Sequence, residues 1–466
     1  MVRAKDPRAV AVIVASALFM QNLDSSVVAT ALPAMARDLH ADPVHLSVAI
    51  TSYLVALCVF IPVSSWVADR FGARRVFMVA IVVFTCASAL VGLSQGVVSL
   101  VAARILQGVG GAMMVPVGRL LLLRRVSKEE LVVAMTWLTM PGLLGPVLGP
   151  PVGGLLTDAF SWRAVFWLNI PVGCLGLVLV WLFIPEVEPQ DPGPLDARGL
   201  TYWGFSLAFL MAGLETLGRS GLAPRWFAPL MLVLGVIATV AAVRHSNRVA
   251  RPAVDLSLLR LPSFSVSILG GTLFRVGAST LPFLLPLKLQ IVFGLSASAS
   301  GGVTFATALG AFAMKPLVRP MLKRFGFRNV LVVNCVLAAI GVAVCALFTP
   351  SWALIAIFAV LAVGGLTRAL QFTSLATLAF ADVPQNKLAP ATAMSGTVQQ
   401  LGQALGVVLG SLALEGAMLA TGAHSAGARE FAIGFVISGL VVLCSLPSML
   451  RMPADAGTRV SGHGGR

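Results

Sequence analysis

Long apolar runs follow one another along almost the whole chain, separated by short polar connections. A helix needs roughly 20 mostly apolar residues to cross a bilayer, because it rises only about 1.5 Å per residue. Runs of this length predict fourteen membrane-spanning helices, at residues 9–34, 45–67, 76–95, 98–121, 131–156, 164–184, 197–216, 226–243, 263–288, 296–318, 329–348, 352–380, 389–415 and 430–449. The pattern therefore predicts an all-α membrane protein.

The composition supports this prediction. Of the 466 residues, 58% are apolar and 11% are charged, and the mean hydropathy is +0.93. A soluble domain carries about 25% charged residues, so this chain could not cover a water-facing surface of its size. The net charge of +15 would favour nucleic acid as the partner of a soluble protein. Here the basic residues lie in short connections without interleaved aromatic residues, which predicts a lipid bilayer around the chain and no nucleic-acid partner.

Other classes of site are not expected. The six cysteines lie within apolar runs without a Cys-x-x-Cys pair, and the chain has only five histidines, which predicts neither a metal site nor a disulfide framework. No Gly-Lys-Ser/Thr loop for nucleotide phosphates is present. The sequence therefore predicts no cofactor, no use of ATP and no enzyme.

Lys and Arg are unevenly distributed among the predicted connections. With the amino terminus inside, 22 of them fall in cytoplasmic segments and six in outer segments, namely Arg37, Arg163, Arg219, Arg225, Lys288 and Arg429. Short cytoplasmic connections are enriched in Lys and Arg, so both termini are predicted in the cytoplasm. The first apolar run contains an acid and no small-residue cleavage site, which predicts a retained helix rather than a signal peptide.

Landmarks of the first half recur in the second half at one spacing. Leu32-Pro33 recurs as Leu285-Pro286, and Gly149 and Gly153 recur as Gly402 and Gly406, in each case 253 residues later. Arg70-Phe71-Gly72 recurs as Arg324-Phe325-Gly326, and Gly110-Gly111 recurs as Gly364-Gly365, in each case 254 residues later. This repeat predicts two six-helix bundles at 1–190 and 256–455, an inserted helix pair at 191–255 and a cytoplasmic tail at 456–466. Parallel repeats of this kind are typical of alternating-access transporters.

The connection after the second predicted span reads Ala68-Asp69-Arg70-Phe71-Gly72-Ala73-Arg74-Arg75. An acid at a helix end, a glycine turn and basic partners can form a charge clasp that holds one conformation. The candidate gating residues are therefore Asp69, Arg70, Gly72, Arg74 and Arg75, although the octet could also serve only as an orientation signal. It resembles the loop motif of the major facilitator superfamily, with Ser65 where that motif starts with Gly. The second copy has Lys323 in place of Asp69, so the second clasp is degenerate.

Two glycine-rich helices add further gating candidates. The run from Arg104 to Ala112 contains glycines that let helices approach closely, and its Arg104 is costly in a membrane unless it is paired or hydrated. The next predicted span contains Gly145, Gly149, Pro150, Gly153 and Gly154, which combine a smooth face with proline bends. Such a helix suits a sliding surface and is equally compatible with plain tight packing.

These runs together resemble the antiporter signature of the fourteen-helix drug:proton antiporter family typified by EmrB and QacA. The run from Asn22 to Pro33 is similar to the helix 1 motif of that family, and the run from Trp162 to Gly173 is similar to the start of its helix 6. The run from Gln107 to Arg119 is most similar to the MdtD branch. The resemblance covers essentially the whole chain and implies a major facilitator fold with proton-coupled export.

Asp24 is the one acid deep within a predicted span. A charged group at mid-bilayer costs roughly 3 kcal/mol on insertion scales and marks ion and substrate paths by default. Burial disfavours the charged carboxylate, so we expect Asp24 to take up and release the coupling proton. The alternative is a structural acid paired with a neighbouring arginine. Glu215 and Glu415 lie near outer helix ends and are weaker candidates.

Several cations also fall within predicted spans. Arg119 and Lys315 lie near cytoplasmic helix ends, where long side chains can reach water. Arg275 corresponds to Asn22 by the repeat offset, and Arg368 corresponds to Met114. We expect a substrate cavity lined by Asn22, Arg275, Arg368, Met113 and Met114.

The sequence thus predicts a monomeric multidrug:proton antiporter of a bacterial inner membrane, which acts without a periplasmic partner. The excess of positive charge within the spans instead favours export of an anionic metabolite, such as a carboxylate or its metal complex. Import stays open, because the motifs do not fix the direction of transport. A membrane sensor is the alternative of another class, although no soluble input or output domain is visible.

Overall fold

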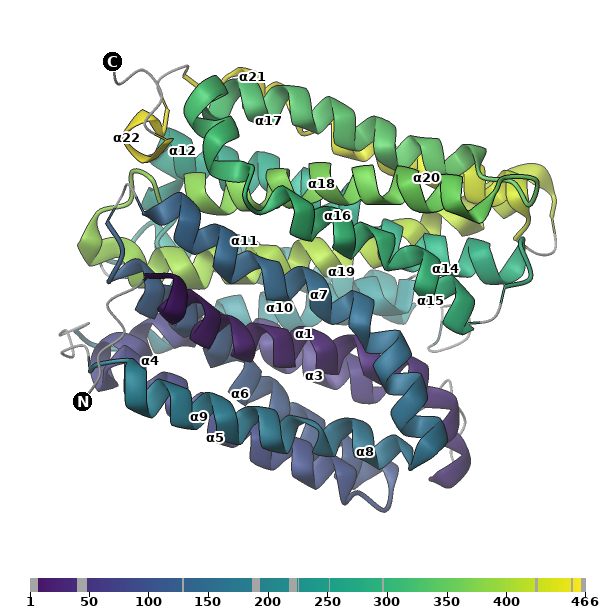
Figure 1. Ribbon diagram of the computed structural model, residues 1–466. Helices are drawn as coiled ribbons and strands as arrows, with labels where there is room; N and C mark the ends of the chain where they lie inside the picture. Colours follow the sequence, from purple (N-terminus) through teal and green to yellow (C-terminus); the bar gives the residue numbers. More distant parts are fainter. Residues whose placement is uncertain are drawn as a thin grey trace. The chain divides into compact units, whose positions relative to one another are not determined.

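The structure is a computed structural model that describes residues 7–39, 48–127, 130–186, 193–217, 224, 226–250, 252–295, 297–423, 426–453 and 456–461. Every secondary-structure element in these ranges is a helix, as predicted (Figure 1). The chain divides into two compact units. Unit 1 comprises Met1–Val126, Leu144–Leu258 and Pro384–Thr397, and unit 2 comprises Ser127–Leu143, Leu259–Val383 and Val398–Arg466.

Unit 1 is built on the helices of the first half of the chain. These are α1 (Pro7–Asp38), α3 (Val48–Phe60), α4 (Val63–Phe71), α5 (Ala73–Gly92), α6 (Val97–Leu123), α8 (Trp162–Trp167), α9 (Asn169–Phe183), α10 (Ala197–Leu217), α11 (Phe227–Ser246) and the short η4 (Gln385–Lys387). Helix α5 packs against α6 and α9, and α3 packs against α6 (Figure 1). The predicted inserted pair is α10 and α11, and α10 also packs against α3, so the pair belongs to unit 1.

Unit 2 contains most of the remaining helices. These are α12 (Pro262–Ser265), η2 (Val266–Gly270), α13 (Gly271–Ser279), α14 (Leu281–Ile291), α15 (Ala297–Thr304), α16 (Ala306–Met314), α17 (Val318–Val344), η3 (Cys345–Leu347), α18 (Leu354–Leu378), α20 (Ala428–Leu443), α21 (Leu446–Leu450) and α22 (Thr458–Ser461). Helix α17 packs against α18 and α20 (Figure 1). Residues of α7 (Leu131–Ala159), α19 (Leu388–Thr421) and η1 (Leu256–Arg260) are divided between the units. The predicted bundle boundaries at 190 and 255 stay predictions.

Nine helical segments of the described residues are long and apolar enough to cross a membrane, and each overlaps one predicted span. Several predicted spans are interrupted, including 45–67 and 263–288. The span 45–67 is broken between α3 and α4 at Pro62, which lacks a backbone donor. The span 263–288 contains the π-helical turn η2 before α13, a distortion that is frequent at functional sites.

The loop glycines of the repeat share an unusual backbone conformation. Gly72, between α4 and α5, has φ 88°, and Gly326, within α17, has φ 73°. Side chains other than hydrogen are disfavoured at such angles. The two positions are 254 residues apart, which supports the repeat predicted from the sequence.

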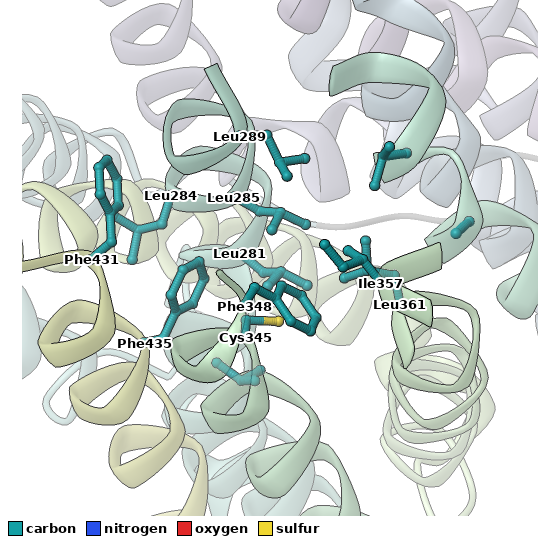
Figure 2. Close-up of a cluster of buried hydrophobic side chains, with 13 residues drawn as sticks. Leu281, Leu284, Leu285, Leu289, Cys345, Phe348, Ile357, Leu361, Phe431 and Phe435 are labelled. Atoms are coloured by element: carbon teal, nitrogen blue, oxygen red, sulfur yellow. The ribbon is translucent and has the colours of Figure 1, made fainter. Parts of the chain in front are cut away.

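The apolar interior of unit 2 includes a cluster of thirteen buried side chains (Figure 2). It joins α14 through Leu281, Leu284 and Leu285 to α20 through Phe431 and Phe435. Cys345 of η3 and Phe348 directly after it belong to the same cluster. This cluster fixes the end of α14, where Lys288 lies, beside the carbonyl groups of η3.

Candidate buried ion-pair site

Asp24 and Arg104 form an ion pair in the interior of unit 1. Asp24 Oδ2 lies 2.6 Å from Arg104 Nη1, and the two residues are 2% and 0% exposed. Asp24 comes from the middle of α1 and Arg104 from α6, which pack against each other. The structure thus pairs the predicted proton-coupling acid with an arginine, the contact that the alternative of a structural acid expected, and this arginine is one of the predicted gating residues. Arg104 is the kind of partner that makes a buried carboxylate tolerable.

Neutral amides complete the surroundings of the carboxylate. Gln107 Nε2 donates to Asp24 Oδ1 at 2.9 Å, and Asn169 Nδ2 donates to the same oxygen at 3.1 Å. Asn169 also donates to Ser88 Oγ at 2.9 Å, which in turn donates to the Phe166 carbonyl. Asp24 is therefore the centre of a network that joins α1, α5, α6 and α9. These hydrogen bonds orient the carboxyl group.

Helix α3 contacts the other side of Arg104. Arg104 Nε donates to the Ala49 carbonyl at 3.2 Å, and the guanidinium carbon lies 4.3 Å from the centre of the Tyr53 ring. A side chain on Gly108 would meet the Tyr53 carbonyl oxygen at 2.7 Å. Glycine at this position therefore lets α6 approach α3 closely enough for these contacts.

The predicted sliding helix α7 touches α1 near the ion pair. A side chain on Gly145 would meet the Asn22 backbone carbon at 2.8 Å, so these helices are in close contact two residues from Asp24. Gly149 and Gly153 are buried in the same helix, whereas the side chain of Pro150 and the surroundings of Gly154 lie outside the described residues. Asn22 donates to the Leu18 carbonyl at 2.8 Å.

The loop motif forms contacts between helix ends of unit 1, as predicted, but with partners that we did not expect. Asp69 Oδ1 binds Arg124 Nη2 at 2.6 Å at the end of α6. Arg74 donates to the Trp181 carbonyl of α9 at 2.7 Å, and Arg75 pairs with Glu186. Burial raises the pKa of Asp69 above its ordinary value of 3.8, and Arg124 opposes that rise. Of the other predicted gating residues in the motif, Gly72 makes the turn and Arg70 is exposed.

The predicted cavity residues are distributed over both units. Met113 and Met114 lie on α6 of unit 1, and Met114 is fully buried. In unit 2, Arg275 is 3% exposed and its Nη1 donates to the Ser267 carbonyl at 3.4 Å. Arg368 is half-buried on α18, and its Nε makes no hydrogen bond to the described residues.

Lys288 is not the outer-connection residue that we predicted. It lies within α14 with no exposed surface, and its Nζ donates to the carbonyls of Cys345 at 2.9 Å and Ala346 at 3.1 Å. The carbonyls at the end of a helix have no partner within that helix, so a buried cation can satisfy them.

Arg119 and Lys315 each contact a neighbouring side chain of the described residues. Arg119 is 2% exposed and donates to Ser395 Oγ at 3.0 Å. The Lys315 ammonium lies 2.7 Å from the centre of the Trp137 ring. Reaching toward water was one of two interpretations of these side chains; Arg119 is buried in the structure, and Lys315 is partly exposed.

The profile of one protein family matches most of the chain. The model of the family described as "Major Facilitator Superfamily" matches residues 14–407. The chain belongs to the Major Facilitator Superfamily. It is therefore a multi-pass membrane transporter and not an enzyme, and the family resemblance seen in the sequence motifs is confirmed.

Curated relatives within the superfamily align over nearly the whole chain. A protein of Pectobacterium carotovorum subsp. carotovorum (strain PC1) named "Putative multidrug resistance protein MdtD" is 35% identical over 447 residues, which is 95% of each chain. The protein of the same name from Escherichia coli (strain K12) is 37% identical over 406 residues, which is 86% of this chain and 85% of that one.

Solved structures show the same fold at low sequence identity. The human organic anion transporter MFSD10 (TETRAN) has a TM-score of 0.68 at 15% identity and covers 95% of this chain and 99% of its own. The proton:xylose symporter XylE has a TM-score of 0.66 at 13% identity, with 99% and 98% covered. These likenesses concern the major facilitator fold alone.

Proposed function

We propose that this chain is a multidrug:proton antiporter that exports small molecules from the cytoplasm by alternating access. The observation that carries the proposal is the buried Asp24–Arg104 ion pair, because it places one protonatable carboxylate at the contact of two helices. The names of the relatives support a drug-like substrate.

Proton occupancy gives this contact two states. When Asp24 is charged, Arg104 neutralises it and ties α6 to α1. When Asp24 takes up a proton, the carboxyl group becomes neutral and its ion pair with Arg104 is lost. The protonated and charged forms therefore favour different packings of α1 and α6, and a ligand that prefers one packing changes the affinity for the proton.

The finer topology belongs to the same proposal. We propose fourteen spans, because α1, α7 and α10 have 32, 29 and 21 residues and are long enough to add to the nine apolar segments. The series α3–α4 and α15–α16 would supply the other two. We place both termini in the cytoplasm of a bacterial inner membrane, since removing Lys288 from the outer group leaves 22 basic residues against five.

The argument for an anionic substrate is weaker than the charge count alone suggested. That alternative depended on the excess of positive charge within the spans, and the charge of Arg104 is neutralised by Asp24. Arg275 and Arg368 are the predicted cavity cations that still favour an anion. A sensor has no observation in its favour.

The test measures protons released from purified, detergent-solubilised protein in weak buffer when a ligand is added. The ligands are the lipophilic cations ethidium and tetraphenylphosphonium and, separately, small carboxylates. We expect release with the cations from the wild type and none from Asp24→Asn. Asp38→Asn is the matched control, because Asp38 lies on the same helix but is partly exposed and pairs with Arg163, and this variant should release protons normally.

The results also decide between the alternatives. Full proton release by Asp24→Asn would exclude Asp24 as the coupling acid. A response to carboxylates alone would replace drugs with anions as the substrate. In proteoliposomes with an inward proton gradient, an antiporter lowers the internal concentration of ethidium, whereas a symporter raises it.

A further inference from the structure

Arg104 has two sets of contacts, and only one of them depends on Asp24. Nη1 binds Asp24 and also donates to Gln107 Oε1 at 2.7 Å. On the opposite side, the Ala49 carbonyl accepts from Nε and the Tyr53 ring lies against the guanidinium. Ala49 and Tyr53 are one turn apart on α3. Helix α3 therefore presents a second surface to the same cation.

Three polar atoms beside this surface are buried, and none makes a regular hydrogen bond to the described residues. They are Gln21 Oε1, Tyr53 Oη and Arg104 Nη2. Gln21 lies one turn before Asp24 on α1, close enough to Tyr53 for the two side chains to interact. Buried polar atoms without a regular hydrogen bond are unfavourable. Their presence in one place indicates a second arrangement of Arg104 in which they are used.

We propose that Tyr53, Gln21 and the Ala49 carbonyl form a holding site for the Arg104 guanidinium while Asp24 is protonated. The inference rests on the proposed function, because it needs Asp24 to be the coupling acid. Tyr53 and Gln21 are then positioning residues, which act on Asp24 through Arg104.

The holding site stabilises the protonated state more than the charged state. While Asp24 is charged, the guanidinium is neutralised, and a neutral pair gains little from the face of an aromatic ring. Once Asp24 is neutral, the cation is unpaired and desolvated, and its attraction to the Tyr53 ring is largest. Gln21 Oε1 can then accept a hydrogen bond from the unused Nη2.

The described surroundings of the pair contain no competing charge. The side chains that contact it from the other helices are neutral: Ser88 and Asn169 through the hydrogen-bond network, Gln107 directly, and Phe166 with its ring 5.8 Å from the guanidinium carbon. Tyr53 is the one other titratable group among these contacts, and a phenol is neutral at physiological pH. A change in pH dependence on altering Tyr53 or Gln21 therefore reports on Asp24 and Arg104.

The test compares the pH dependence of ethidium:proton exchange in proteoliposomes for wild type, Tyr53→Leu, Tyr53→Phe and Gln21→Leu. Loss of the ring or of the acceptor disfavours the protonated state, so a lower pH is needed to reach it. We expect the pH of half-maximal exchange to fall by about 0.5 to 1 unit in Tyr53→Leu and Gln21→Leu. Tyr53→Phe keeps the ring and should stay close to the wild type.

The outcomes separate this inference from the proposed function. A shift in Tyr53→Phe as large as in Tyr53→Leu would assign the effect to the hydroxyl group and overturn the holding site. Unshifted profiles of Tyr53→Leu and Gln21→Leu, with Asp24→Asn inactive, would also overturn it and leave the proposed function intact. Wild-type protein that exchanges no protons with any ligand would instead remove the proposed function itself. If Tyr53→Leu does not fold, the profile of Gln21→Leu decides.

Discussion

The two units stabilise their buried charges in different ways. In unit 1, Arg104 is neutralised by a carboxylate, Asp24. In unit 2, Lys288 and Arg275 donate to backbone carbonyls instead. A backbone carbonyl is not protonated in aqueous solution at any ordinary pH, whereas a carboxylate can be protonated. Under the proposed function, unit 1 therefore holds a switchable pair, Asp24 and Arg104, whereas Lys288 and Arg275 of unit 2 contact carbonyl groups that do not change charge.

Among the described residues of unit 2, Glu430 is the buried acid, and its place supports the same distinction. It accepts from Thr421 Oγ1 at 2.8 Å and from the Gly427 backbone N–H at 2.9 Å at the start of α20. These are the contacts of a helix cap. The buried acid of unit 2 therefore stabilises a helix end, and under the proposed function the coupling proton binds in unit 1.

The largest expected effect comes from separating the switchable pair. Arg104→Ala leaves Asp24 buried without its cation, and it should lower the free energy of unfolding by about 3 to 5 kcal/mol. The double variant Asp24→Asn/Arg104→Ala removes both charges and should recover most of that loss. Thermal unfolding in detergent measures both. A double variant as unstable as Arg104→Ala would show that the cost is packing and not charge.

A smaller effect is expected from removing a structural cation. Lys288→Met keeps a long apolar side chain but leaves the carbonyls of Cys345 and Ala346 without their donor, which should cost about 1 to 3 kcal/mol. The pH dependence of ethidium:proton exchange should stay that of the wild type. A displaced pH profile would mean that unit 2 takes part in proton coupling, and it would end the contrast between the units.

The smallest expected effect is on local stability at low pH, and it concerns Asp69 and Asp196, two acids of unit 1 that lie outside the predicted spans. Burial raises the pKa of Asp69, so its charge is lost at a higher pH than in a free aspartate, and its pair with Arg124 weakens first on acidification. Burial alone would also raise the pKa of Asp196, but hydrogen bonds from the Gly199 backbone, His245 and the Ala253 backbone outweigh it and lower the pKa.

The stabilisation from Asp196 is therefore present above about pH 3.9 and is lost only as the pH falls through its lowered folded-state pKa. Amide hydrogen exchange at decreasing pH should show faster exchange around Asp69 before Ala253 loses protection. Asp196→Asn should remove the later transition and leave the earlier one in place. The reverse order would contradict the assignment of the two acids.

The sequence was most informative where a charged residue stands within an apolar run. Asp24 is conspicuous because an acid is costly in an apolar run, and Arg104 is conspicuous for the same reason. The positions of the helices followed from hydropathy, because the bilayer requires long apolar segments. The break at Pro62 was missed, since a proline within an apolar run can equally bend a continuous helix.

Contacts between helices could not be predicted from the local pattern. Arg124 was predicted in a cytoplasmic segment, but its ion pair with Asp69 was not predicted, because 55 residues separate the two partners. Tyr53 and Gln21 could not be recognised as site residues from the sequence, because a polar aromatic ring or an amide in a span is compatible with ordinary packing. Lys288 was misplaced because a cation near the end of an apolar run is typical of a connection.

Gly72 and Gly326 give the repeat an evolutionary meaning. If the two halves descend from one duplicated segment, their buried charges have since diverged, as Asp24 and its counterpart Gly277 illustrate. The glycine at a left-handed backbone position is rarely replaced during evolution, because most other residues are strained at such a φ angle. These two glycines are therefore where traces of common ancestry should persist longest.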